Sequence, residues 1–171
     1  MRWTVIGAVM VVAAVAGCSA STDSPGTPVV SRQTLQTDVA DRLAKAGDPP
    51  QSVVCQEDLV GEIGRTARCD VAMSAANGFQ PVATVTRVDG ITVDYELTPA
   101  LSQAQLEKAV AGLVAENVGD RVDSVACESG LEGKVDATAR CDVDAGGGKA
   151  RRTVRVTDVS GLTMNFNLSS E

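Results

Sequence analysis

The chain has 171 residues, a formal net charge of −7 and no histidine, and aromatic residues make up only 2% of it. A chain this acidic does not neutralise phosphate groups, which argues against nucleic acid as a partner. Without histidine it also lacks the commonest general base and the commonest zinc ligand.

The N-terminus has the pattern of an export signal. Arg2 precedes an apolar run from Val5 to Ala16, which is shorter than the roughly 20 residues that span a bilayer. The run ends at Val15-Ala16-Gly17-Cys18, a lipobox pattern: small residues let a peptidase reach the backbone, and only a thiol accepts a diacylglyceryl group. The sequence therefore predicts a signal peptide over 1–17 and a lipid on Cys18 that anchors the protein to the extracytoplasmic face of the cell membrane. The alternative is an uncleaved anchor helix that contains a chance cysteine.

The segment after the lipobox has the composition of a tether. Residues 19–30 read SASTDSPGTPVV, rich in Ser, Thr, Pro and Gly and without apolar periodicity. We expect 18–30 to be the lipidated cysteine and a flexible tether.

The rest of the chain repeats itself. Residues 52–55 read SVVC and 124–127 read SVAC, while 66–71 and 138–143 both read TARCDV, each pair at an offset of 72 residues. Residues 88–93 (VDGITV) match 159–164 (VSGLTM) at an offset of 71, which one deletion after the second cysteine explains. The sequence predicts two copies of one module, over 31–98 and 101–169.

Each copy opens with a predicted helix, over 32–46 and 103–118. Ser31 and Ser102 are N-cap candidates, and Gln105 completes a capping box. Gly47 and Gly119 stand where glycines end helices. Apolar residues recur at helical spacing in both copies, namely Leu35, Val39 and Leu43, and then Leu106, Val110, Leu113 and Val114.

Strands follow each helix. We expect a short strand from Val53, then strands over 66–73, 82–88 and 91–97, the last two joined by a hairpin turn at Asp89-Gly90 with both residues at φ > 0. Apolar residues alternate with polar ones along the last strand of each copy, at Ile91, Val93, Tyr95 and Leu97 and at Leu162, Met164, Phe166 and Leu168. One face is therefore buried, and only the helix can cover it. The predicted fold class is α+β: two tandem modules, each with one helix packed on a four-stranded antiparallel sheet. The short link Thr98-Pro99-Ala100 suggests that the modules touch.

Four cysteines remain besides Cys18. In an oxidising compartment Cys55, Cys69, Cys127 and Cys141 indicate two disulfides. Zinc is the rival interpretation, but its cysteine ligands usually come in pairs two to four residues apart, whereas these are fourteen apart. The equal spacings favour Cys55–Cys69 and Cys127–Cys141 among the three possible connectivities. Each bridge would contribute about 3 kcal/mol in the chain-entropy model.

These residues resemble a known family. The run from the first cysteine through Leu59 and Gly64 to Cys69, followed by a strand rich in Val and Thr and by Asp89-Gly90, resembles the DUF4333 family (domain of unknown function 4333). The resemblance covers both halves and implies a secreted or lipidated protein of the kind found in actinobacteria, including mycobacteria. It implies no activity.

Catalytic and metal-binding patterns are weak. There is no Gly-x-Ser-x-Gly and no Ser-x-x-Lys, so we predict no catalytic residues, no cofactor and no metal, and expect the protein not to be an enzyme. Lys149, Arg151, Arg152 and Arg155 form one basic cluster, which either contacts an acidic partner or lipid headgroups or is a solvated hairpin face.

The function that the sequence favours is a non-catalytic interaction lipoprotein. Its partners would be the membrane, through Cys18, and an unknown envelope protein or lipid. The loops closed by the cysteines, 56–68 and 128–140, are the expected contact surface. Two alternatives remain open: a carrier or sensor of an apolar envelope ligand, which needs a large cavity, and an inhibitor of an extracellular enzyme. The inhibitor hypothesis rests on architectural likeness to the secreted protein that blocks β-lactamases.

Overall fold

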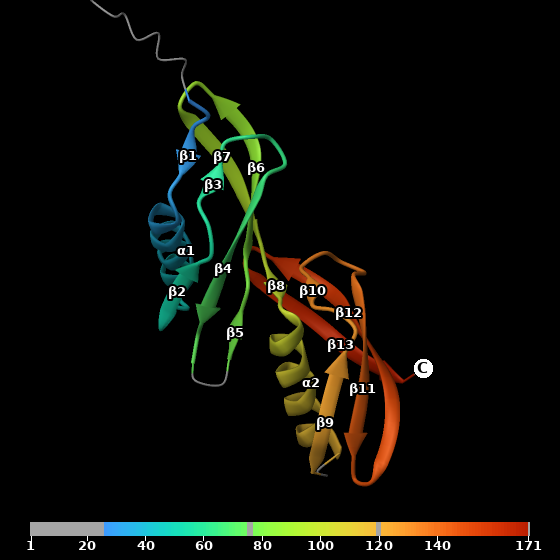
Figure 1. Cartoon of the computed structure of the whole chain (residues 1–171). Helices are drawn as coiled ribbons and strands as arrows, with labels where there is room; N and C mark the ends of the chain where they lie inside the picture. Colours follow the sequence, from blue (N-terminus) through green and yellow to red (C-terminus); the bar gives the residue numbers. More distant parts are fainter. Residues whose placement is uncertain (1–25, 75–76, 119–120, 171) are drawn as a thin grey trace, which may run out of the picture.

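The computed structural model describes residues 26–74, 77–118 and 121–170. It contains two tandem modules, each with one helix, several strands and one disulfide (Figure 1). The first module comprises β1 (Val29–Val30), α1 (Arg32–Ala46), β2 (Ser52–Cys55), β3 (Leu59–Val60), β4 (Thr66–Ala72), β5 (Gly78–Phe79), β6 (Val82–Asp89) and β7 (Thr92–Thr98). The second comprises β8 (Ala100–Leu101), α2 (Gln103–Val118), β9 (Val122–Cys127), β10 (Leu131–Glu132), β11 (Thr138–Ala145), β12 (Gly148–Ser160) and β13 (Thr163–Ser170).

Both helices have the predicted bounds because their signals are local. The Ser31 hydroxyl accepts a hydrogen bond from the Thr34 N–H at 3.1 Å, and Gly47 ends α1 in the left-handed conformation at φ 97°. The capping box forms at α2, where the Ser102 N–H donates to Gln105 Oε1 at 2.9 Å. Gly119, the expected end of α2, lies outside the described residues.

The helices bury the expected stripe with one exception. Leu35, Val39 and Leu43 of α1 are buried, as are Leu106, Val110 and Val114 of α2. Leu113, predicted as a core residue, instead lies on the flank of α2, where it lines a cavity described below.

The sheets are antiparallel and differ between modules. The second module has the predicted four strands, in the order β13-β12-β11-β9. The first has the order β2-β4-β6-β7 with a fifth short strand, β5, paired with β4. Proline lacks the N–H that a strand needs, so Pro81 separates β5 from β6. Arg152 stands at the equivalent position of the second module, and there β12 runs unbroken.

Two short ribbons were not predicted. β1 pairs with β3, and β8 pairs in the same way with β10. Val29 and Val30, which we expected in the tether, therefore belong to the first module, as the strand that pairs with β3. Gly61 and Gly133 permit this pairing, because a Cβ on Gly133 would collide with the Pro99 carbonyl oxygen and one on Gly61 would lie 2.6 Å from the Pro28 oxygen.

The hairpin turns lie one residue later than predicted. Asp89 pairs with Thr92, so the turn residues are Gly90 and Ile91, not Asp89 and Gly90. Only Gly90 has a positive φ (58°), the arrangement of a type II′ turn. Ile91 is consequently at the tip and 90% exposed, not on the buried face.

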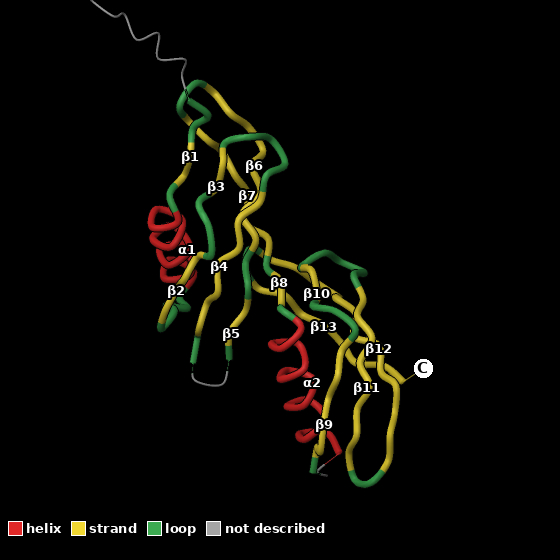
Figure 2. The backbone as a smooth tube through the Cα atoms, viewed as in Figure 1, coloured by secondary structure: helices red, strands yellow, loops and turns green. Residues whose placement is uncertain are grey.

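The disulfides tie each helix-facing sheet together. They join Cys55 to Cys69 and Cys127 to Cys141, as the equal spacings predicted, and each links directly opposed residues of neighbouring strands. Each helix lies along its own module's strands (Figure 2). A helix side chain accepts from the backbone N–H of the first cysteine in both modules: Gln36 from Cys55 at 3.2 Å, and Glu107 from Cys127 at 2.9 Å.

Candidate binding cleft between the modules

A cleft of about 850 Å³ lies between the two modules. Its walls come from β2, β4 and β5 of the first module and from α2 and β13 of the second, and the connecting segment from Pro99 to Leu101 forms its base. Ligand sites in proteins commonly have volumes of about 300–1,000 Å³, so the size is that of a binding site.

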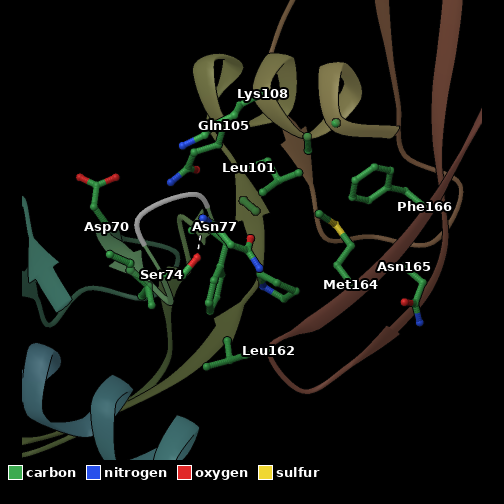
Figure 3. A pocket seen from close by; sticks show the side chains of 18 of the residues that line it. Asp70, Ser74, Asn77, Leu101, Gln105, Lys108, Leu162, Met164, Asn165 and Phe166 are labelled. Carbon is green, nitrogen blue, oxygen red and sulfur yellow. Dashed lines mark hydrogen bonds between the residues drawn. The ribbon is translucent and has the colours of Figure 1, made fainter. Parts of the chain in front are cut away.

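The cleft has two unlike walls (Figure 3). Asp70, Ser74 and Asn77 stand on the first-module side, whereas Met164 and Phe166 of β13 stand opposite. Gln105 and Lys108 project from α2 at the rim, and Phe79, Leu101, Leu113 and Leu162 add apolar surface. An apolar wall facing fixed polar groups suits a ligand with one apolar and one polar side.

The polar wall is held in place by its own hydrogen bonds. Asp70 accepts from Gln80 Nε2 at 2.9 Å and also from the Gln56 amide. The Asn77 N–H donates to the Ser74 hydroxyl at 3.0 Å. β5 approaches β4 closely, because a Cβ on Gly78 would lie 2.6 Å from the Val71 carbonyl oxygen.

The apolar wall differs from the same surface of the first module. Helix positions in the two copies correspond at an offset of 71, so Ala109, Gly112 and Leu113 stand where α1 has Asp38, Asp41 and Arg42. Phe166 of β13 corresponds to Tyr95 of β7. The cleft thus lies where the second copy has replaced charged and hydroxylated side chains by apolar or small ones.

In the first module this surface is closed by polar contacts. The Tyr95 hydroxyl donates to Asp38 Oδ2 at 2.8 Å, and Arg42 Nε donates to the same oxygen at 2.9 Å. The Arg42 guanidinium carbon lies 5.9 Å from the Tyr95 ring centroid. Burial, followed by the bond to Asp38, raises the pKa of Tyr95 to about 12, and the bond to Asp38 raises the pKa of Arg42.

Leu162 joins the modules at one end of the cleft. It follows Gly161 in the β12–β13 turn of the second module, yet it packs against the hydrophobic core of the first. The Gln80 N–H of the first module also donates to the Ala100 carbonyl at 2.7 Å. Ile91, the residue equivalent to Leu162, has no such contact and is 90% exposed.

The disulfide-closed loops lie away from the cleft. No residue of 56–68 or 128–140 lines it. Both loops are pinned to the next strand, since the Gly64 N–H donates to Val85 and the Asp136 N–H to Val156. Their tips expose Ile63 and Val135, and Gly64 and Asp136 share a positive φ of 84° and 70°.

Two members of the predicted basic cluster, Arg151 and Arg155, form surface ion pairs. Arg151 contacts Glu128 and Asp142, each at 3.0 Å, and Arg155 contacts Asp136 at 3.4 Å. Lys149 and Arg151 border a smaller hollow of about 350 Å³ on the outer face of β9, β11 and β12.

The described ranges contain neither a metal-ligand cluster nor a membrane-spanning helix. There, no cluster of three His, Cys, Asp or Glu side chains is placed to hold a metal ion. Neither helix in the described part of the chain is long and apolar enough to cross a membrane. The lipobox and Cys18 lie outside the described residues.

The repeated architecture agrees with comparison to known families. Residues 13–90 and 92–161 each match the model of a family described as Domain of unknown function (DUF4333). The chain belongs to the DUF4333 family. Its two copies of the DUF4333 domain correspond to the two modules, which confirms the tandem repeat. No curated protein and no solved structure is similar enough to this chain to count as a match.

Sequence reasoning missed most residues of the cleft. It interpreted Leu113 as a core position and assigned no role to the outer face of α2. Met164 and Phe166, predicted on the buried face, do pack against the second module's core, but they also line the cleft. The repeat itself carried the signal: aligned at an offset of 71, the two helices differ in polarity at Ala109, Gly112 and Leu113.

Proposed function

We propose that this protein is a lipid-anchored, non-catalytic binding protein of the cell envelope, and that the cleft between its modules holds a segment of a partner protein. The observation that carries the proposal is the change in polarity between the copies. Exposed apolar surface costs free energy in water, about 25 cal/mol for each Å². A helix flank that presents Ala109, Gly112 and Leu113 to an open cleft therefore suits a function in which the cleft is filled.

The second sheet favours a polypeptide as the occupant. β13 pairs with β12 on one side only and is the edge strand of the described sheet. Its residues Met164, Asn165 and Phe166 line the cleft. An extended segment can add to such an edge through backbone hydrogen bonds while its alternate side chains enter the apolar wall. The side chains facing it would meet Asp70 and Asn77.

A photo-crosslinking amino acid at Leu113 tests the site in living cells. Arg42 is the matched control, because it occupies the equivalent position on α1. We expect a protein adduct, identified by mass spectrometry, from Leu113 and not from Arg42. Adducts from Ile63 and Val135 but not from Leu113 would place the contact on the disulfide-closed loops and would contradict the proposal.

Filling the cleft supplies a second test. Gly112→Phe places a ring in the cleft, and a Cβ at this position meets no atom within 4 Å, so the helix can accept it. Asp41→Phe is the matched change on α1. We expect Gly112→Phe to abolish the Leu113 adduct and Asp41→Phe to leave it intact.

An apolar envelope ligand is the second candidate, and the volume of the cleft favours it. Such a ligand would remain bound through mild purification. Native mass spectrometry of the detergent-extracted protein would then show an added mass that Gly112→Phe removes. A defined lipid recovered in this way, together with no protein adduct at Leu113, would replace the first proposal.

Lipid anchoring is tested separately at Cys18. We expect the mature protein to begin at Cys18 with acyl chains attached, and Cys18→Ser to leave the protein unlipidated. An intact N-terminus at Met1 in membrane-extracted protein would contradict this part of the proposal.

A further inference from the structure

The first module carries exposed apolar side chains near its N-terminal strand. Ile91 is 90% exposed, Ile63 75% and Val29 54%. These three, here called the apolar tip, include the two most exposed large hydrophobic residues in the described part of the chain.

Contacts at Gly61 bring the three segments of the apolar tip to one end of the module. The Gly61 N–H donates to the Pro28 carbonyl at 2.7 Å, and a Cβ on Gly61 would lie 2.8 Å from Val93 Cγ2. Val29 follows Pro28, Ile63 is two residues after Gly61, and Ile91 is two residues before Val93. Figure 1 shows β1 and the β6–β7 turn together at the end of the first module that points away from the second.

In the second module, the residues equivalent to Val29 and Ile91 are buried or packed against another surface. Ala100, equivalent to Val29, is 5% exposed, and Leu162, equivalent to Ile91, packs against the first module. The hairpin tip of this fold therefore contacts another surface in one copy, and in the other copy it faces outward.

Most charges beside the apolar tip are paired. Arg65 contacts Glu62 at 2.9 Å, and Arg87 contacts Asp89 at 3.0 Å. Asp94 stands opposite Arg87 and leaves one net negative charge here, against −7 for the whole chain, so an anionic surface repels this end only weakly.

The N-terminal segment limits how far this end can lie from a lipid on Cys18. Eight residue steps separate Cys18 from Gly26. A fully extended chain spans at most about 3.5 Å per residue, hence about 28 Å in all. A tether this short gives the first module a high effective concentration at the bilayer surface. A contact with the bilayer that would be too weak to hold the free protein there therefore becomes occupied.

We propose that the apolar tip rests on the bilayer, with Ile91 and Ile63 in its interfacial layer. The inference rests on the lipid anchoring proposed above. It gives the first module a fixed orientation, with β6 and β7 leading away from the membrane toward the cleft. The cleft then faces outward, within reach of a partner.

Single tryptophans test this orientation. Trp3 is the only tryptophan and lies in the predicted signal peptide, so the processed protein is expected to have none. The lipoprotein carrying Ile91→Trp, Ile63→Trp or Val135→Trp is reconstituted into vesicles of phosphatidylcholine and phosphatidylglycerol with brominated acyl chains. Val135 is the matched control, since it is 51% exposed at the position of the second module that corresponds to Ile63.

We expect bromine to quench most of the fluorescence at positions 91 and 63 and little of it at 135. Flotation with the vesicles, measured on the same samples, reports anchoring. Protein that floats but shows no quenching at 91, or equal quenching at 91 and 135, overturns this inference and leaves the anchoring intact. Protein that does not float overturns both.

Discussion

Leu162 provides the sharpest test of how the modules are joined. Leu162→Ala removes three carbon atoms from a side chain that belongs to the second module but packs against the core of the first. A fully buried methylene contributes about 0.8 kcal/mol, so complete burial would give about 2.4 kcal/mol. Leu162 is only partly buried, and we expect a loss of about 1–1.5 kcal/mol.

The matched control is Ile91→Ala, at the same turn position of the first module. Because Ile91 is 90% exposed, its truncation should change the free energy of unfolding by less than about 0.5 kcal/mol. Urea unfolding of the oxidised protein, followed by circular dichroism, measures both values.

Hydrogen exchange locates the effect. In Leu162→Ala, we expect faster exchange in β4 and β5 of the first module, although the substitution lies in the second. Equal destabilisation by the two variants, or faster exchange confined to the second module, would refute the conclusion that Leu162 couples the modules.

Three further predictions follow from single residues. The pKa of Tyr95 rises from its ordinary value of 10 to about 12 on folding, so its contribution to stability is complete below pH 10 and is lost between pH 10 and 12. Screening by solvent at this partly exposed site reduces the contribution to about 1 kcal/mol. Tyr95→Phe should abolish that part of the pH dependence of urea unfolding. An unchanged pH profile would contradict the role of Tyr95. Gly133→Ala should lower the free energy of unfolding by more than about 2 kcal/mol, because the new Cβ meets backbone and ring atoms of Pro99. Gly112→Ala, in open space within α2, should raise it by about 0.5–1 kcal/mol. Thermal unfolding that ranks the two variants in the opposite order would refute the contact between Gly133 and Pro99. Gly64 and Asp136 both have a positive φ. Asp136→Gly should therefore leave the free energy of unfolding unchanged or raise it, and Gly64→Ala should lower it by about 1 kcal/mol. A lower free energy of unfolding in Asp136→Gly would show that the ion pair with Arg155 outweighs the backbone strain.

Features with local signals were predicted well from the sequence. The bounds of α1 and α2 follow from serine caps and apolar spacing, which depend on residues within one helix. The disulfides follow from a spacing that occurs twice. The hairpin turns were misplaced by one residue because the type II′ turn needs a positive φ only at its first position, which Gly90 supplies.

Features that depend on distant contacts were not predicted. β1 and β3 have two residues each, and they form because Gly61 lets Pro28 approach, which no pattern within β1 reveals. Leu113 has the spacing of a core residue, since one apolar stripe can be wide enough to face both its own sheet and a neighbouring module. Only comparison of the two copies distinguishes these surfaces.

The pairing of β8 with β10 has a consequence for cleavage by proteases. Proteases cut where several consecutive residues can leave the surface and become extended. Pro99 and Ala100 are buried, and Ala100–Leu101 forms the first strand of the second module. The junction therefore offers no accessible stretch for cutting, and a cut there would remove the strand on which the second module depends. Cleavage at this junction would therefore not release the two modules as separate pieces.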